Sequence, residues 1–150
     1  MQIRLYKCAV DEDPMLAVFD RTFPVSHSFL ERRDHTKGRQ HLNILLGCSE
    51  TLIAEVDGSV IGFITVDDEG YISALYVGRT CIGAGSALLQ ATEGRHRHLW
   101  LHVFQENSLA IEFYKARGFA VVDEDMQIDS LRRRHRRYAM ERANGSIVYR

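Results

Sequence analysis

The chain has 150 residues and a mass of 17.2 kDa, a size that suits one domain whose core needs no disulfide or metal. Its 19 Lys and Arg nearly balance its 20 Asp and Glu, which argues against a dedicated nucleic-acid-binding protein or a polybasic membrane protein. No apolar run approaches the ~18 residues of a membrane span, and the N-terminus lacks the apolar block of a secretory signal. Because the 3 cysteines are widely separated, we expect no disulfide framework and a cytoplasmic protein.

The first half of the chain predicts two helices flanked by strands. In chain order, we expect a strand at residues 3–7, helices at 11–22 and 26–46, and strands at 51–56 and 60–66. Acidic residues and Pro14 mark the start of the first helix, and Pro24 is expected to break it. The second helix is expected to be interrupted. Asp57-Gly58, between the last two strands, is a strong hairpin signal.

The second half predicts strands that alternate with helices. In chain order, we expect a strand at 71–77, a helix at 83–93, a strand at 99–104, a helix at 108–117, and strands at 119–122 and 138–141. This order predicts an α/β (α+β) fold with a mixed, mostly antiparallel central sheet and helices on both faces. No linker or repeat interrupts the chain, so residues 1–141 are expected to form one domain, and 142–150 a mobile tail.

A glycine-containing loop between a strand and a helix gives the first chemical signal. At a helix start the backbone amides have no intrahelical partner and the helix dipole is positive, which favours an anion. Gly83 and Gly85 lack a Cβ atom, so a diphosphate can approach the main chain, and Arg79 can add a charge-assisted contact. A plain strand–turn–helix with packing glycines is the alternative. The pattern is neither a Walker loop nor a Rossmann fingerprint.

The strand and helix between Leu99 and Phe119 give the second signal. Asn107 or Ser108 can cap this helix. Tyr114 carries a phenol with an ordinary pKa of ~10, which can protonate a departing thiolate or alkoxide. The alternative is an amphipathic helix whose tyrosine simply packs.

Together these segments resemble the GNAT superfamily of acetyl-CoA-dependent N-acetyltransferases, in its branch of small bacterial enzymes. The resemblance spans residues 2–141 and is most specific from Leu75 to Phe119. Its motifs are Gly83-x-Gly85-x-x-Leu88-Leu89, then Asn107-x-x-Ala110-x-x-Phe113-Tyr114-x-x-x-Gly118-Phe119, and the shorter Ser26-His27-x-Phe29-Leu30.

The resemblance implies the GNAT fold, in which strands 71–77 and 99–104 splay apart and hold the arm of acetyl-CoA, the co-substrate. The implied cofactor-binding residues are Leu75, Tyr76, Val77, Arg79, Ile82, Gly83, Ala84, Gly85, Ser86, Asn107 and Tyr114. Tyr114 matches the general acid that protonates the coenzyme A sulfur. The loop between Val77 and Gly83 is shorter than the family's and carries Thr80 at its usual basic position. We therefore expect weakened or re-registered phosphate binding.

Acetyl transfer also needs a polarised thioester carbonyl and a neutral amine. A main-chain amide near Leu75 or Tyr76 is expected to polarise the carbonyl, as an oxyanion hole does. Direct attack in a ternary complex needs no nucleophilic cysteine.

The base that deprotonates the amine is not fixed by the sequence. Tyr71 is the candidate catalytic residue on the strand facing the cleft, while Glu55 and Glu69 are carboxylate alternatives. His27, Phe29 and Ser73 are the candidate residues for binding the acceptor, because the histidine titrates near neutrality and the others lie beside it or on the cleft strand. We expect His102 to have a surface role.

The leading hypothesis is an N-acetyltransferase that transfers an acetyl group from acetyl-CoA to a primary amine of a small molecule, peptide or protein. The alternative is a coenzyme A-binding regulatory or interaction domain with little catalysis. A third hypothesis, RNA contact through the run Arg132–Arg137, is disfavoured because this run lacks interleaved aromatic residues. We predict no nucleic-acid or membrane partner, no metal site because the histidines lack familiar ligand spacing, and a monomer or homodimer.

Overall fold

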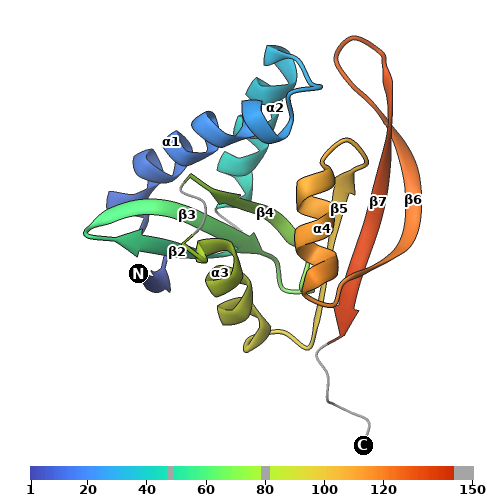
Figure 1. The fold of residues 1–150 in the computed structure, drawn as a ribbon. Coiled ribbons are helices and arrows are strands. Elements are labelled where there is room, and N and C mark those ends of the chain that lie inside the picture. The colour runs from blue at the N-terminus through green and yellow to red at the C-terminus, as the bar shows by residue number, and fades with distance from the viewer. Residues whose placement is uncertain (47–48, 79–81, 144–150) are drawn as a thin grey trace, which may run out of the picture.

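The computed structural model describes residues 1–46, 49–78 and 82–143, in which four helices accompany two antiparallel sheets (Figure 1). The strands are β1 (Gln2–Leu5), β2 (Glu50–Val56), β3 (Ser59–Val66), β4 (Ile72–Val77), β5 (His98–Phe104), β6 (Ala120–Ile128) and β7 (Arg134–Ala143). The helices are α1 (Cys8–Ser26), α2 (Arg32–Leu45), α3 (Ala84–Glu93) and α4 (Ser108–Ala116). The first sheet has the order β1-β2-β3-β4 and the second has the order β5-β7-β6.

Helices cover the first sheet on both faces, and each face has its own hydrophobic core (Figure 1). On one face, Met15 and Phe19 of α1 and Leu42 of α2 pack against β2 to β4. On the other face, Leu88 of α3 and Tyr114 of α4 join the inward residues of both sheets. The expected α/β architecture with helices on both faces is therefore confirmed.

The two sheets join where β4 begins. Tyr71 and Trp100 form a parallel bridge, and the Trp100 amide donates to the carbonyl oxygen of Gly70 at 3.0 Å. Beyond this bridge β4 continues in the first sheet while β5 pairs with β7 in the second. The two neighbouring strands therefore diverge, as expected for strands 71–77 and 99–104.

The predicted break of the first helix at Pro24 is wrong. Helix α1 begins earlier, at Cys8, because the carboxylate of Asp11 accepts the Lys7 amide at 2.7 Å and also binds Arg4. Pro24 lies in the last turn and cannot donate to the carbonyl oxygen of Asp20, but Phe19 and Phe23 pack this part of α1 into the core and hold the helix. The helix ends where the His27 amide donates to the carbonyl oxygen of Phe23 at 2.8 Å.

The last two strands are longer than predicted. They form a hairpin, β6–β7, that rises beside α4 in Figure 1 and includes charged residues between the two predicted strands. Arg136 pairs with Glu124 at 3.0 Å, and Arg137 pairs with Asp125 at 2.8 Å across the hairpin. Arg142, which we expected in a mobile tail, belongs to β7, and residues 144–150 lie outside the described residues. None of the helices in the described segments is both long and apolar enough to span a membrane.

Candidate active site

A cavity of about 710 Å³ lies between the diverging strands β4 and β5 and is bordered by all four helices. It is lined by most of the predicted site residues: His27, Tyr71, Ser73, Leu75, Tyr76, Val77, Gly83, Ala84, Gly85, Ser86, Asn107 and Tyr114. Two predicted residues are not in this lining. Ile82 is 40% exposed, and Phe29 packs behind the cavity wall. Arg79 lies outside the described residues.

The cleft-facing edge of β4 offers main-chain donors and acceptors. The Gly78 amide donates to Ile61 O of β3 at 2.7 Å. Because amide directions alternate along a strand, the Tyr76 amide also points toward β3, whereas those of Leu75 and Val77 point toward the cleft. Of the two amides expected to polarise the carbonyl, that of Leu75 therefore points into the cleft and that of Tyr76 does not.

A β-bulge sets the geometry of β4 just after the bridge to β5. Thr65 of β3 pairs with Ala74 and Val66 pairs with Ile72, so Ser73 has no partner across the ladder. A bulge bends its strand and increases the local twist, which turns β4 away from β5. The Ser73 hydroxyl lies 3.3 Å from the carbonyl oxygen of Thr65.

Helix α3 begins at the far end of β4 with a left-handed residue. Gly83 is its N-cap with φ of +78°, and a Cβ atom there would meet nothing within 4 Å. The first intrahelical bond runs from the Ala87 amide to Gly83 O at 2.9 Å, so the amides of residues 84–86 precede the helical ladder. At Gly85 a Cβ atom would lie 3.3 Å from the ring of Phe113, so the missing side chain lets α3 pack closely against α4.

Arg117 places a positive charge beside this helix start. Its guanidinium donates to the hydroxyl of Ser86 and to Phe113 O, the latter at 3.1 Å. The guanidinium carbon also lies 3.9 Å from the centre of the Phe113 ring. Sequence reasoning missed Arg117, although its position three residues after Tyr114 places both on one face of a helix.

Tyr114 and Asn107 approach the cavity from α4 and its start. Tyr114 is 8% exposed and packs edge-on against Phe113 and Phe119, each at 5.2 Å between ring centres. Burial raises the pKa of Tyr114, and the neighbouring Tyr76 raises it further, so the phenol is protonated at neutral pH. Asn107 is the N-cap residue but makes no side-chain capping bond, which leaves its amide for the cavity that it lines.

Aromatic side chains form the wall opposite α3 and α4. His27 stacks on Phe23 with ring centres 4.3 Å apart, and its Nδ1 lies 2.7 Å from the Ser26 hydroxyl. Burial lowers the pKa of His27 to about 4, partly opposed by its hydrogen bond with the Phe23 backbone. Tyr76 packs edge-on against Phe19 at 5.0 Å, and burial raises the pKa of its phenol. The wall is therefore uncharged at neutral pH.

His102 lies in the cavity lining, contrary to the expected surface role. Its Nδ1 is 2.9 Å from the hydroxyl of Tyr71 across the junction of the two sheets. The sequence signal was its alternation with Leu101 and Val103, which places it on the opposite face of β5 from the core. The carboxylate alternatives do not line the cavity: Glu55 pairs with Arg4 at 2.8 Å, and Glu69 is exposed in a turn.

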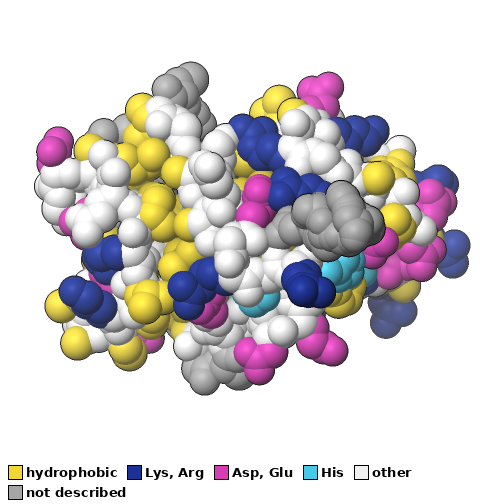
Figure 2. All heavy atoms as spheres, turned by 90° about the horizontal axis from the view of Figure 1, so that it is seen from below, with side chains coloured by type: hydrophobic (Ala, Val, Ile, Leu, Met, Phe, Trp, Pro, Cys, Tyr) yellow, Lys and Arg dark blue, Asp and Glu magenta, His cyan; other side chains and the backbone are white. Residues whose placement is uncertain are grey.

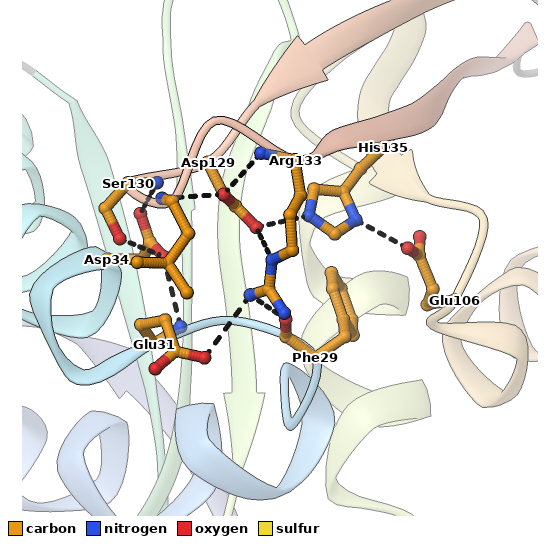
Figure 3. Close-up of polar contacts among 9 residues, drawn as sticks. Phe29, Glu31, Asp34, Glu106, Asp129, Ser130, Arg133 and His135 are labelled. Carbon is orange, nitrogen blue, oxygen red and sulfur yellow. Dashed lines mark hydrogen bonds and ion pairs between the residues drawn. The ribbon is translucent and has the colours of Figure 1, made fainter.

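A network of ion pairs joins the turn between β6 and β7 to the loop between α1 and α2 (Figure 3). Arg133 binds Asp129 at 2.8 Å, Glu31 at 3.3 Å and the carbonyl oxygen of Phe29 at 2.9 Å. Asp34 accepts hydrogen bonds from the amide of Ser130 at 3.0 Å and from its hydroxyl at 2.9 Å. The network therefore holds Phe29 in place behind the aromatic wall.

His135 is the buried centre of this network. Its two ring nitrogens lie 2.7 Å from Asp129 and 2.6 Å from Glu106. Figure 3 shows the imidazole between these two carboxylates. The hydrogen bonds with Asp129 and then Glu106 raise the pKa of His135. Burial would raise the pKa of Asp129, but hydrogen bonds from His135 and from the Arg133 and Leu131 amides hold it well below its usual range.

The basic run Arg132–Arg137 overlaps the start of β7, and carboxylates neutralise most of its arginines. Arg133, Arg136 and Arg137 each form an ion pair with an acidic residue. On the face shown in Figure 2, Lys and Arg side chains lie among Asp and Glu side chains. The pairing of Arg133, Arg136 and Arg137 with carboxylates gives no support to RNA contact through this run. Among the described residues, no three or more His, Cys, Asp or Glu side chains are grouped so as to hold a metal ion.

The sequence and fold match known proteins. The model of the acetyltransferase (GNAT) family matches residues 13–119. Peptidyl-lysine N-acetyltransferase YiaC of Escherichia coli is 38% identical over 80 residues, a match that covers 52% of this chain and 55% of YiaC, about half of each protein.

Solved structures share the fold at lower sequence identity. The apo solution structure of YjaB from Escherichia coli has a TM-score of 0.77 at 20% identity, covering 93% of this chain and 95% of YjaB. The PaiA N-acetyltransferase of Thermoplasma acidophilum, in complex with coenzyme A, has a TM-score of 0.75 at 21% identity, covering 96% and 100% of the two chains. The family model spans both the diverging strands and the motifs of α3 and α4, so the chain belongs to the acetyltransferase (GNAT) family.

Proposed function

We propose that the protein is an acetyl-CoA-dependent N-acetyltransferase that acetylates a primary amine by direct attack in a ternary complex. One observation carries the proposal. A single cavity between β4 and β5 is lined by the start of α3, by the Tyr114 phenol and by an uncharged aromatic wall. An anion site, an acid and an acceptor pocket thus border the same space. Family membership and the coenzyme A complex of the similar PaiA protein support acetyl-CoA as the co-substrate.

The start of α3 fits the diphosphate of coenzyme A. The amides of Ala84, Gly85 and Ser86 and the positive end of the helix dipole favour an anion there. Arg117, whose guanidinium donates to the Ser86 hydroxyl, adds a cation beside this helix start. The amides of Leu75 and Val77 and the side chain of Asn107 are available to the pantetheine arm along the cleft.

Acetyl-CoA supplies the acetyl group as a thioester, and the protein supplies polarisation and proton control. The Leu75 amide is directed into the cleft, where it can stabilise the developing oxyanion. Tyr114 donates a hydrogen bond to the departing sulfur. Because its pKa is raised above that of a thiol, ~8.5, the phenol transfers its proton only as it gains one from the attacking nitrogen. The phenol thus relays the proton from the attacking nitrogen to the departing sulfur.

The acceptor pocket suits the aliphatic stem of a lysine. Phe23, His27 and Tyr76 present uncharged aromatic surface, which can surround methylene groups while the amine reaches the thioester. The name of the relative YiaC, a peptidyl-lysine N-acetyltransferase, agrees with a lysine side chain of a peptide or protein as acceptor. Tyr71 and Ser73 lie at the start of the same cleft strand.

The test combines binding with turnover. Calorimetry with acetyl-CoA should give saturable binding, and a thiol assay with peptidyl lysine, free amino acids and polyamines should give CoA release for at least one amine. Mass spectrometry should then find an acetyl group on the amine nitrogen. Saturable binding without release for any amine would instead identify a coenzyme A-binding domain with little catalysis. No binding would refute both functions.

A further inference from the structure

The junction between β4 and β5 brings together the side chains of Tyr71 and His102, which are 31 residues apart in sequence. Tyr71 precedes β4, and His102 lies within β5. The phenol oxygen and the imidazole Nδ1 are 2.9 Å apart, and the two rings meet edge-on at 5.5 Å between centres. Trp100 packs against both rings, at 4.5 Å from Tyr71 and 5.6 Å from His102. Both side chains line the cavity.

We infer that Tyr71 and His102 form a proton relay that deprotonates the acceptor amine, with Tyr71 touching the amine and His102 accepting the proton behind it. This inference rests on the proposed function, because it assigns the base of that reaction. Tyr71, which touches the amine, is the catalytic residue. His102 acts through Tyr71, as the positioning residue that receives the proton. The reaction needs such a base because an ammonium group has no lone pair with which to attack the thioester.

The relay starts from a protonated phenol and a neutral imidazole. Partial burial raises the pKa of Tyr71, so its phenol keeps its proton. Burial, together with the nearby Arg137, lowers the pKa of His102, so its imidazole is neutral at neutral pH. The relay requires the tautomer in which the phenol donates to Nδ1 and the imidazole proton is on Nε2. A free lone pair on the phenol oxygen remains for an N–H group of the acceptor.

The charged groups around His102 come from the other two strands of its sheet, β7 and β6. Arg137 of β7 opposes protonation of His102, whereas Asp125 and Asp123 of β6 favour it. Arg137 is itself bound to Asp125 in a two-pronged ion pair of 2.8 and 3.0 Å. The acidic side chains therefore act on His102 through a partly neutralised pair. This arrangement lets an imidazolium form during the reaction while the resting state is neutral.

The proton transfers balance. An ammonium N–H proton passes to the Tyr71 oxygen as the phenol proton passes to Nδ1 of His102, leaving a neutral amine, a phenol and an imidazolium. The nitrogen lone pair then forms the bond to the thioester carbon, and the carbon–sulfur bond breaks. The second nitrogen proton reaches the sulfur through Tyr114. His102 returns to its starting state when a proton leaves from Nε2 to solvent.

The test is the pH profile of kcat for His102→Asn, with a lysine peptide blocked at both ends as the acceptor probe. The asparagine oxygen can accept the Tyr71 bond near the position of Nδ1 but cannot take up a proton. We expect kcat at neutral pH to fall by about 100-fold or more. The deficit should shrink as the pH rises towards ~10, where the lysine amine loses its own proton. His98→Asn, on the exposed end of β5, is the matched control and should keep the wild-type profile.

The outcomes separate this relay from the proposed function. A wild-type enzyme that is active while His102→Asn keeps the same pH midpoint and rate overturns the relay alone. A wild-type protein that releases no CoA with any amine refutes the proposed function. Nitrogen NMR of His102 in the wild-type protein adds a test without turnover: we expect the Nε2–H tautomer and a midpoint below the ordinary ~6.5. A proton on Nδ1 at neutral pH would overturn the relay.

Discussion

The amide of Trp100 and the carbonyl oxygen of Gly70 are joined at 3.0 Å, and the two strands separate from this bond onward. The bulge at Ser73 follows immediately, and the cavity lies beyond the single bridge between Tyr71 and Trp100. The cleft therefore has a fixed vertex. Any change that moves this vertex should alter both the stability of the fold and the binding of acetyl-CoA.

Gly70→Ala should strain the vertex. Gly70 has φ of +83°, and an added Cβ atom would overlap the carbonyl oxygen of His98. The left-handed conformation costs about 1–2 kcal/mol for a residue with a side chain, and the overlap adds a further ~1–3 kcal/mol. Urea unfolding should show this loss of stability. An unfolding free energy equal to that of the wild type would mean that the backbone here can move freely.

Gly83→Ala should affect binding more than stability. Gly83 has φ of +78° and faces open space, as does Gly58 in the turn between β2 and β3. Each alanine should therefore cost a similar ~1–2 kcal/mol of folding free energy. At Gly83 the new methyl group also occupies the approach to the α3 amides, so acetyl-CoA should bind about tenfold more weakly, or ~1.4 kcal/mol. Gly58→Ala should leave affinity unchanged, and equal affinities for the two variants would remove the α3 start as the anion site.

Arg117→Ala should weaken acetyl-CoA binding. A hydrogen bond to a charged group contributes about 1.5–3 kcal/mol, so the affinity should fall roughly 10- to 100-fold. The dependence of affinity on salt should also become shallower, because one cation is lost. Lys115→Ala, which removes an exposed cation from the same helix, should have little effect. Arg117→Lys should recover part of the affinity, and calorimetry at two salt concentrations measures each value.

Tyr114→Phe should lower kcat by about 10²- to 10⁴-fold while acetyl-CoA affinity changes little. The phenol acts on the departing sulfur, whereas its ring supplies the packing against Phe113 and Phe119, which phenylalanine retains. Thiol release measures kcat, and calorimetry measures affinity. Tyr138→Phe is the control, because Tyr138 packs against the core but does not line the cavity. If Tyr114→Phe keeps wild-type kcat, the proton reaches the sulfur by another route.

Stability should depend on pH through His135. Its pKa is raised in the folded protein above the unfolded value of ~6.5, so folding favours the protonated form. The stabilisation that protonated His135 gives the fold is complete below the unfolded pKa of ~6.5. It is lost as the pH rises through the folded pKa. Urea unfolding across this range should show wild-type stability falling with rising pH, relative to His135→Gln. Parallel pH curves for the two proteins would show that the bonds to Asp129 and Glu106 leave folding unchanged.

Local signals in the sequence predicted the parts of the fold that depend on neighbouring residues. Asp57-Gly58 predicted the β2–β3 hairpin, where Asp57 has φ of +51° and Gly58 of +78°. The predicted end of the first helix at Pro24 was wrong because packing against the sheet holds the final turn of α1 in place. The long β6–β7 hairpin was missed because nearly every residue of β6 is exposed, so its sequence lacks the apolar alternation of a half-buried strand.

The sequence by itself determined the family, the order of strands and helices, and the placement of Tyr114 and the α3 start at a common cleft. These follow from motifs and periodicities that act over a few residues. The tertiary structure alone decided that the Tyr76 amide faces β3, that Arg117 stands beside Ser86, and that Tyr71 meets His102. The physical reason is that register, bulges and sheet divergence arise from contacts between distant segments, and these set the direction of each group toward the cavity.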